Sequence, residues 1–164
     1  MAGSADDVYE AGARVGALLK GRGETVAVAE SSAGGLVSAA LLAVPGASAY
    51  FLGGGVIYTR AARRALLGLP DEHTRMRGAT EEYAELVART IRQRLETTWG
   101  LSESGATGPT GNRYGDAAGH ACFAVAGPVE RTITLETGIA DRAENMHRFA
   151  IAALEFLQAA LKDG

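Results

Sequence analysis

The sequence predicts an α/β fold in which helices cover both faces of a mixed sheet. A β-type run at residues 25–29 is followed by a polar, glycine-rich turn and an apolar helical segment, which is the first half of a βαβ unit. Near the C-terminus, two β-type runs are joined by Gly127-Pro128, a pattern typical of an antiparallel hairpin. The order along the chain is α-β-α-β-α-α-β-β-β-α. Because neither a repeat nor an interdomain linker interrupts it, we expect residues 1–164 to form a single domain.

Composition excludes several classes of protein. Hydrophobic residues make up 47% of the chain and charged residues 21%, which is typical of a globular domain. The formal net charge is −3, and we find no signal segment and no apolar run of the roughly 18 residues that span a membrane, so no nucleic-acid or membrane partner is expected. Cys122 is the single cysteine and the three histidines are widely spaced, which excludes an internal disulfide and a zinc motif. We expect a cytoplasmic protein without a metal or a cofactor.

The first segments of the chain have clear boundaries. Ser4 has capping-box spacing to Asp7 and predicts the start of an amphipathic helix, which Gly21 and Gly23 end. The apolar residues of this helix share one face: Val8, Ala11, Val15, Leu18 and Leu19. After the strand at residues 25–29, residues 36–44 are apolar almost all round and predict a buried helix that Pro45-Gly46 stops.

The middle of the chain predicts a second strand and two helices. The strand extends from Tyr50 towards Tyr58, and its three central glycines would weaken it or make it bulge. A short basic helix follows at residues 60–67. Thr80 can cap a longer helix, and the apolar residues of that helix share a face: Ala84, Val87, Ala88, Ile91 and Leu95.

The last third predicts three strands and a helix. Residues 102–107 form a third strand of weak β-propensity, and a loop of glycine and polar residues follows at 108–119. Residues 120–126 and 131–137 form the hairpin. The final helix has the clearest apolar spacing in the chain: Met146, Phe149, Ala150, Ala153, Leu154, Leu157 and Leu161.

Polar and glycine residues concentrate where three of these strands end. In an open α/β sheet, ligands bind beyond the carboxyl ends of the parallel strands. The segments at 30–35, around Tyr58 and at 105–119 should all lie there. This convergence is the main functional signal in the pattern.

Ser31 and Ser32 follow the first strand and precede a helix. Unpaired N–H groups at that helix start, with Gly34 and Gly35 allowing close approach, could hold an anion or a developing oxyanion. A serine in this place is more often a simple N-cap than a nucleophile. Glu30 fits three roles equally well: an acid at a helix start, a buried partner of an arginine, or a hydrogen-bond acceptor for a substrate.

Two other segments could contact a ligand. Residues 104–111 contain enough glycine to wrap a phosphate or a sugar, although they match neither a P-loop nor a dinucleotide fingerprint and could be an irregular turn. Arg60, Arg63 and Arg64 form a basic patch near Tyr58, which is either a solvated helix face or a contact to an anionic ligand.

Three stretches of the sequence resemble the CinA C-terminal domain, the nicotinamide-nucleotide amidase family, and the likeness runs from about residue 5 to 162. Residues 29–35 are similar to the family's Ala-Glu-Ser-Cys-Thr-Gly-Gly. Residues 44–54, together with Tyr58, are similar to its second block. Residues 104–109 are similar to its Thr-Gly-Ile-Ala-Gly-Pro.

The resemblance implies a fold and an activity. The fold would be a three-layer α/β/α sandwich with a mixed, mainly parallel sheet of about five strands, without metal and frequently a homodimer. The activity would be hydrolysis of the carboxamide of nicotinamide mononucleotide to the acid and ammonia, with Ser31 as nucleophile and Tyr58 beside it. The resemblance places the substrate among these further residues: Glu30, Gly34, Gly35, Ser104, Gly105, Thr107, Gly108 and Arg142.

The chain departs from the family pattern at a lysine that helps to activate the serine. Arg63 occupies that position, and the only two lysines, Lys20 and Lys162, lie elsewhere in the sequence. A guanidinium remains protonated at ordinary pH, so Arg63 could bind a phosphate or act on Tyr58 but could not accept the serine proton. Two explanations stay open. Another group serves as base, namely Tyr58, His120 or Asp116, or the domain binds a nucleotide or a protein partner without turnover.

Overall fold

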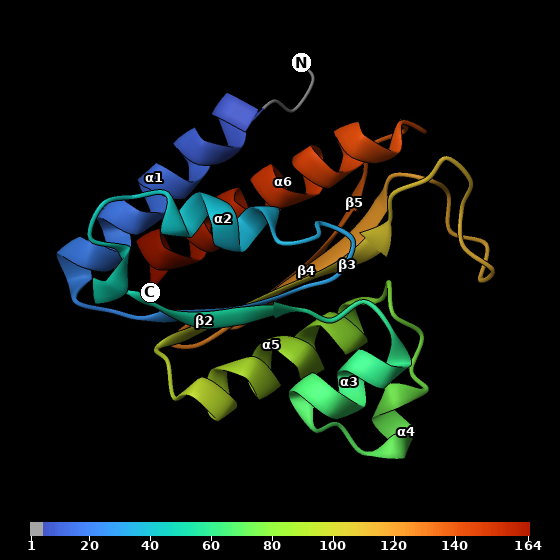
Figure 1. The fold of residues 1–164 in the computed structure, drawn as a ribbon, viewed down its shortest axis with the longest axis horizontal. Coiled ribbons are helices and arrows are strands. Elements are labelled where there is room, and N and C mark those ends of the chain that lie inside the picture. The colour runs from blue at the N-terminus through green and yellow to red at the C-terminus, as the bar shows by residue number, and fades with distance from the viewer. Residues whose placement is uncertain (1–4) are drawn as a thin grey trace.

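Five strands form one mixed sheet in the part of the chain that the computed structural model describes, residues 5–164 (Figure 1). In spatial order they are β2 (Phe51–Val56), β1 (Val26–Glu30), β3 (Trp99–Ala106), β4 (His120–Ala126) and β5 (Arg131–Glu136). Strand β1 is parallel to both β2 and β3, whereas β4 is antiparallel to β3 and β5. Because β4 alone runs against the others, the prediction of a mixed, mainly parallel sheet of about five strands is confirmed.

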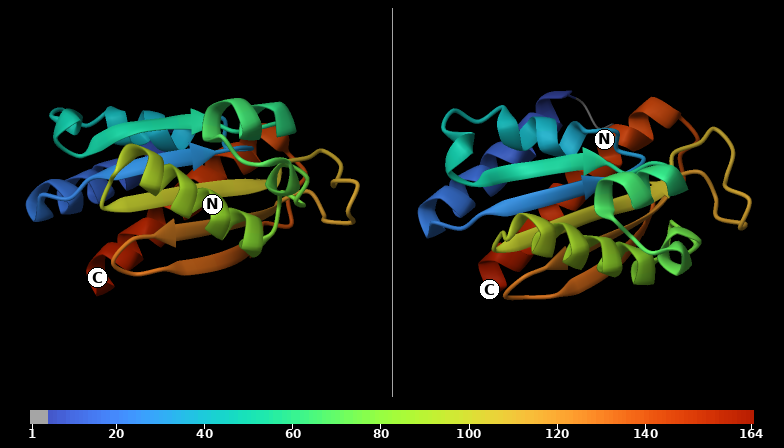
Figure 2. Two further views of the ribbon diagram at one scale, coloured as in Figure 1. Left: turned by 90° about the horizontal axis from the view of Figure 1, so that it is seen from below. Right: turned by 60° about the horizontal axis from the view of Figure 1, so that its bottom comes forward.

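Helices cover both faces of the sheet, which confirms the three-layer prediction. Helices α1 (Ala5–Arg22), α2 (Leu36–Leu42) and α6 (Arg142–Asp163) lie on one face (Figure 1). Helices α3 (Arg60–Leu67), α4 (Asp71–Thr74) and α5 (Glu81–Leu95) lie on the other, as both views of Figure 2 show. Across residues 5–164, no helix combines the length and the apolar character that crossing a membrane requires.

The larger hydrophobic core lies between the sheet and α1, α2 and α6. Trp99 and Phe123 from the strands are buried there against Phe149 and Leu154 of α6. The face under α5 is built from smaller side chains, and this allows the helix to approach the sheet closely. At Gly100 of β3, an added Cβ would lie 2.2 Å from the carbonyl oxygen of Ala88 in α5, so only glycine fits this contact.

The structure adjusts several predicted boundaries. Strand β3 begins at Trp99, three residues before the prediction, because residues 99–102 pair with β1. Helix α4 was not predicted, and the Ser4 cap lies outside the described residues. Helix α2 is buried on one side only: Val37 is inaccessible, whereas Leu42 is 54% exposed. The bulge of β2 falls between Phe51 and Gly53, at the start of the strand instead of its middle.

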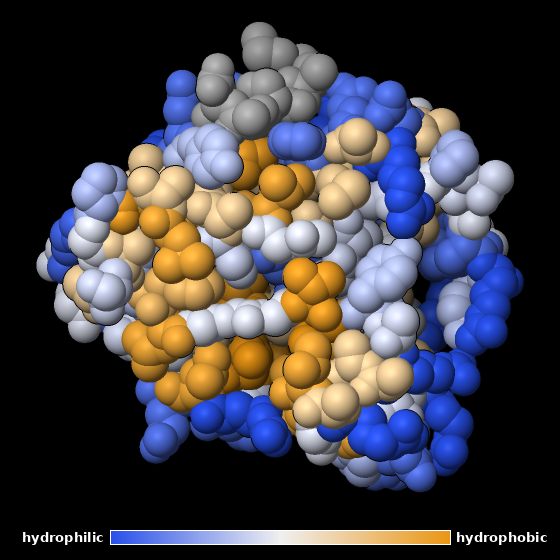
Figure 3. All heavy atoms as spheres, in the orientation of Figure 1, coloured by the Kyte–Doolittle hydropathy of each residue, from blue (hydrophilic) through white to orange (hydrophobic). Residues whose placement is uncertain are grey.

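The outer edge of the sheet at β2 carries several exposed apolar side chains. Leu52 and Val56 of the strand, Leu42 of α2 and Leu66 of α3 are all more than two fifths exposed. In the space-filling view, hydrophobic surface extends across the region of α2 and β2 (Figure 3).

Candidate active site

The ends of β1, β2 and β3 surround a cavity of about 300 Å³. The segment that follows β3 extends well beyond this end of the sheet (Figure 2). Five of the residues predicted for the site line the cavity: Ser31, Tyr58, Arg63, Ser104 and Gly105. A larger hollow of about 500 Å³ between α1, β5 and α6 contains none of the predicted site residues. The structure therefore brings one residue from each predicted strand exit into the same small space.

Ser31 lies in a turn that the buried carboxylate of Glu103 holds by hydrogen bonds. One oxygen of Glu103, on β3, accepts hydrogen bonds from the backbone N–H groups of Ser31 and Ala33 at 2.9 and 2.8 Å. The other oxygen accepts from the hydroxyl of Ser32. No hydrogen bond involves the Ser31 hydroxyl within residues 5–164, so this oxygen is free for a ligand in the cavity.

Glu103 is almost inaccessible to solvent, with 2% of its surface exposed. Burial raises the pKa of its carboxyl group, and the nearby charge of Glu30 acts in the same direction, while the hydrogen bonds from Ser32, Ser31 and Ala33 oppose the rise. Such a carboxyl is a positioning group for the turn and has no opening to the cavity.

Glu30 is the acid at the start of α2. Its carboxylate accepts hydrogen bonds from the N–H groups of Gly35 and Val37 at 3.0 Å and of Ser38 at 2.8 Å. These are the donors that the sequence offered to an external anion or oxyanion, so that prediction is corrected: the protein fills its own helix N-terminus. With both oxygens engaged and 1% exposure, Glu30 positions the turn and does not reach the cavity.

Gly34 and Gly35 shape the same turn and do not line the cavity. Their φ angles are +69° and +103°, a region that favours glycine. A Cβ at Gly34 would also come within 2.8 Å of the Met146 side chain on α6. Their contribution is to bend the chain from β1 into α2.

Tyr58 connects the exit of β2 to the loop after β3. Its side chain is 56% exposed, and its hydroxyl oxygen accepts a hydrogen bond of 3.0 Å from Arg142. Arg142 also donates to the carbonyl oxygen of Gly108 at 2.6 Å. The carbonyl of the neighbouring Thr107 accepts from Asn145 at 2.8 Å, and neither Thr107 nor Gly108 lines the cavity. Arg142, Thr107 and Gly108 thus support the wall on which Tyr58 lies.

Arg63 is held in place by protein groups. Its Nη1 donates to the carbonyl oxygens of Thr74 and Met76 at 3.0 and 2.7 Å, and its guanidinium stacks 4.1 Å from the centre of the Tyr83 ring. The Nε atom is buried and has no hydrogen-bond partner within the described residues. Nη2 lies next to Gly78, a lining residue, so closely that a Cβ there would be 2.8 Å away.

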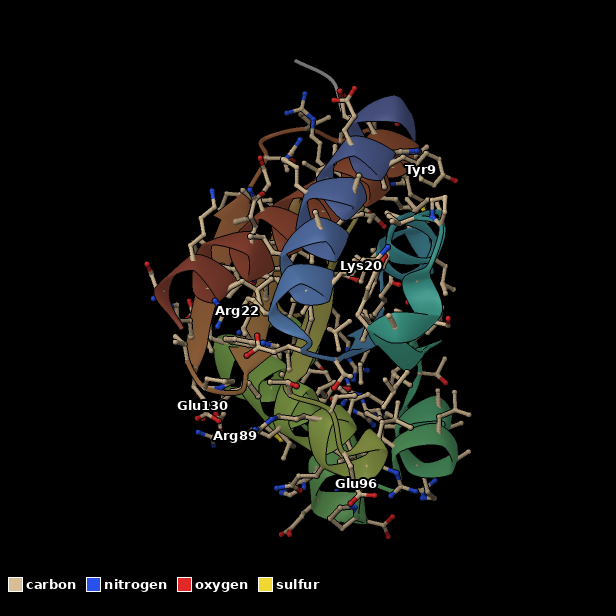
Figure 4. The ribbon with its side chains drawn as sticks, turned by 90° about the vertical axis from the view of Figure 1, so that its left-hand side faces the viewer. Tyr9, Lys20, Arg22, Arg89, Glu96 and Glu130 are labelled. Carbon is tan, nitrogen blue, oxygen red and sulfur yellow. The ribbon has the colours of Figure 1, made fainter. Side chains whose placement is uncertain are left out.

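Neither lysine of the chain substitutes for the family residue that Arg63 replaces. Lys20 of α1 donates to the carbonyl of Pro45 at 3.0 Å, near the start of β2 and thus at the opposite end of the sheet (Figure 4). Lys162 lies in the last turn of α6. That turn also belongs to the opposite end, because Gly164 approaches Trp99 at the start of β3.

Of the three candidate proton acceptors, Tyr58 alone lines the cavity. His120 bonds to Glu136 through one ring nitrogen and to the carbonyl of Ala79 through the other, at 2.5 and 2.8 Å. Burial acts to lower the pKa of His120, but Glu136, the Ala79 carbonyl and Asp116 together raise it above the ordinary value. Asp116 is bonded by Arg77 and Asn112, and although burial opposes them, its pKa is lowered. Both groups are therefore engaged outside the cavity.

Sequence reasoning missed several residues that the structure places at the site. Glu103 holds the serine turn, and Arg113 and Tyr114 line the cavity. The signal for Glu103 was an acid between two serines in a buried strand, where an unpaired charge would be costly. Arg113 and Tyr114 lie in the 108–119 loop, where no periodicity gives a direction to a side chain. Within residues 5–164 no three His, Cys, Asp or Glu side chains cluster as a metal site would require.

Comparison with known proteins identifies relatives over nearly the whole chain. The family model of the CinA C-terminal domain matches residues 9–161. A CinA-like protein from a Cyanothece species is 40% identical over 147 residues, which cover 88% of this chain and 35% of that protein. Another CinA-like protein, from Salinibacter ruber, is 36% identical over 156 residues, which cover 92% of this chain and 38% of that protein. The chain thus spans about a third of the length of these curated relatives.

Solved structures share the same fold. A competence or damage-inducible protein from Enterobacter asburiae superposes with a TM-score of 0.86 at 28% identity, covering 94% of this chain and 98% of the other. A CinA superfamily protein from Klebsiella pneumoniae has a TM-score of 0.89 at 24% identity, covering 96% of this chain and 99% of the other. At this identity the likeness concerns the fold alone.

Proposed function

This chain belongs to the CinA C-terminal domain family, and on that premise we propose that it is an amidohydrolase that converts nicotinamide mononucleotide to nicotinate mononucleotide and ammonia. One observation carries the proposal. The hydroxyl of Ser31 is unbonded within the described residues and opens into a cavity shared with Tyr58, Ser104 and arginine side chains. A phosphorylated amide needs these groups together: a nucleophile for the carbonyl carbon and cations for the phosphate.

In the proposed reaction the Ser31 oxygen attacks the carboxamide carbon. The serine proton passes to Tyr58 and then to the departing nitrogen, which leaves as ammonia. Water then attacks the acyl-serine, which releases the carboxylate and restores the hydroxyl. Arg142 supports this role of Tyr58 because it donates to the phenol oxygen. Since Arg63 stands where the family has a lysine and cannot accept the serine proton, we expect turnover to be slow.

The oxyanion of this reaction requires a donor from the far wall of the cavity. The N–H groups of Ser31 and Ala33 are bonded to Glu103, and those at the start of α2 are bonded to Glu30. The Ser104 hydroxyl and the Nη2 of Arg63 lie beside Gly78, and all three residues line the cavity. We assign oxyanion stabilisation to this pair.

Ammonia release from nicotinamide mononucleotide tests the proposal. We expect slow release by the purified chain and loss of at least about 100-fold in Ser31→Ala, because the covalent route needs that oxygen. Ser48→Ala, at an exposed serine in the short helix Ala47–Ala49, is the matched control and should leave the rate unchanged. Ammonia release that survives in Ser31→Ala would remove Ser31 from the mechanism.

A second candidate function is nucleotide binding without turnover. The observation that favours it is Arg63, a permanent cation at the position of the family lysine whose Nη1 is bonded to two backbone carbonyls. Calorimetric binding of nicotinamide mononucleotide by a wild-type chain that releases no ammonia would select this alternative.

A further inference from the structure

The lining of the cavity carries positive charge without compensation. Arg60, Arg63 and Arg113 are among the lining residues, whereas no aspartate or glutamate is. No ion pair joins these three arginines to a carboxylate anywhere in residues 5–164. Several arginines elsewhere on the surface are paired with carboxylates. Arg64, on the same helix as Arg60, is paired with Asp71 at 2.8 Å, and Arg89 is paired with Glu130 at 2.6 Å (Figure 4).

The rim of the cavity is formed by two arginines from separate segments. Arg60 is the first residue of α3, and Arg113 belongs to the loop between β3 and β4. Both act on the hydroxyl of Tyr114. Arg113 donates to it at 2.7 Å, and this bond, with the charges of Arg113 and Arg60, lowers the pKa of Tyr114. The hydroxyl oxygen of Tyr114 therefore lies close to both guanidinium groups at this rim.

Arg63 adds a third cation deeper in the cavity. Its stack on Tyr83 and its two backbone bonds fix the guanidinium, so binding an anion there requires little further ordering. The bonds use Nη1, which leaves the edge formed by Nε and Nη2 without a hydrogen-bond partner within the described residues. Nε is buried and Nη2 is assigned to the oxyanion, so binding of the phosphate falls to the two arginines at the rim.

We propose that Arg60 and Arg113 bind the phosphate of the substrate and make this chain select phosphate monoesters over the corresponding unphosphorylated compounds. The inference rests on the proposed function for the identity of the amide, but the phosphate contact can be measured without turnover. A phosphate monoester carries close to two negative charges near neutral pH, which two guanidinium groups match. The amide end of the same molecule is then left to meet Ser31, which lines the same cavity.

Calorimetric titration with nicotinamide mononucleotide and with nicotinamide riboside tests this inference. The variants are Arg60→Gln and Arg113→Gln, both at exposed positions where the fold tolerates the change, and Arg64→Gln is the control. The control removes the same charge from the same helix without touching the cavity lining. We expect Arg60→Gln and Arg113→Gln each to weaken mononucleotide binding about 10- to 100-fold, as loss of a charge-assisted hydrogen bond does, and to leave riboside binding within about twofold. Ribose 5-phosphate, which has no amide, should show the same loss.

The outcomes separate this inference from the proposed function. If the cavity variants weaken mononucleotide binding no more than Arg64→Gln does, or weaken riboside binding equally, the phosphate assignment is overturned. If the binding pattern is as expected but the wild-type chain releases no ammonia, the phosphate site stands and the amidase proposal fails. If ammonia is released but the preference for mononucleotide over riboside in kcat/KM is unchanged in Arg60→Gln and Arg113→Gln, the amidase proposal stands and the phosphate assignment fails.

Discussion

Two buried glutamates hold the segment around Ser31, and they do so with different partners. Glu30 ends β1 and Glu103 lies in the neighbouring β3, and their exposures are 1% and 2%. All three hydrogen bonds to Glu30 come from backbone N–H groups of the first turn of α2. Glu103 accepts two such bonds on one oxygen and a hydroxyl bond from Ser32 on the other.

The difference shows which of the two positions needs a carboxylate. A backbone N–H can only donate, so the position of Glu30 requires acceptors on both oxygens. A hydroxyl can donate or accept, so a side-chain amide at position 103 could satisfy every group: its oxygen would face the two N–H groups and its nitrogen would donate to Ser32. Although Glu30 and Glu103 are similarly buried, only the position of Glu30 requires a carboxylate.

Removal of the Glu103 side chain should have the largest effect. Glu103→Ala leaves two N–H groups and a hydroxyl without their acceptor in a buried place, at about 1–3 kcal/mol for each unsatisfied group. We expect the free energy of unfolding to fall by roughly 3–6 kcal/mol in urea titration. Glu155→Ala, at an exposed position of α6, should change it by less than about 0.5 kcal/mol. A loss below about 1 kcal/mol in Glu103→Ala would mean that water replaces the carboxylate.

The two glutamine variants test the comparison directly. In Glu30→Gln, the amide nitrogen must face at least one of the N–H groups of Gly35, Val37 or Ser38, which should cost about 1–3 kcal/mol of unfolding free energy. Glu103→Gln should lose less than about 1 kcal/mol, because its donors and acceptors can all be matched. Equal losses in urea titration of the two variants would break the proposed distinction.

The pH dependence of Glu103→Gln should be the smallest effect and the one that isolates the carboxyl. Burial raises the pKa of Glu103 above the value of 4.5 that serves as its reference, so the folded chain holds this proton more tightly than the unfolded chain does. The stability that this carboxyl contributes is present at low pH and is lost as pH rises through the raised pKa. We expect the melting temperature of the variant, relative to that of the wild type, to be higher at pH 8 than at pH 5. A difference independent of pH would contradict the raised pKa.

Much of the fold could be predicted because apolar residues repeat at regular spacing along the long helical segments, and this spacing indicates which face of each helix is buried. The apolar spacing of α6 and the Thr80 cap of α5 both led to elements that the structure contains, with Thr80 accepting from the N–H of Tyr83. The start of β3 was missed because pairing with β1, and not the propensity of residues 99–101, makes that segment a strand.

The site was less predictable because its geometry depends on contacts between distant segments. Ser31 and Tyr58 could be proposed from their places at strand exits. The partner of the serine turn, Glu103, lies 72 residues from Ser31 in sequence, and nothing local to either residue indicates the bond. For the same reason the N–H groups after Ser31 looked available for an anion until the structure showed the carboxylates that use them.

No acidic residue lines the cavity, and its two rim arginines, Arg60 and Arg113, form no ion pair with any carboxylate of the described residues, so they leave a positive field at this rim. A substrate with a neutral carboxamide at one end and a phosphate at the other enters such a field in one orientation. For the proposed hydrolysis, the acid keeps the phosphate of the amide from which it came. The two rim arginines would therefore hold the product as well as the substrate, and its departure would require the same contacts to break.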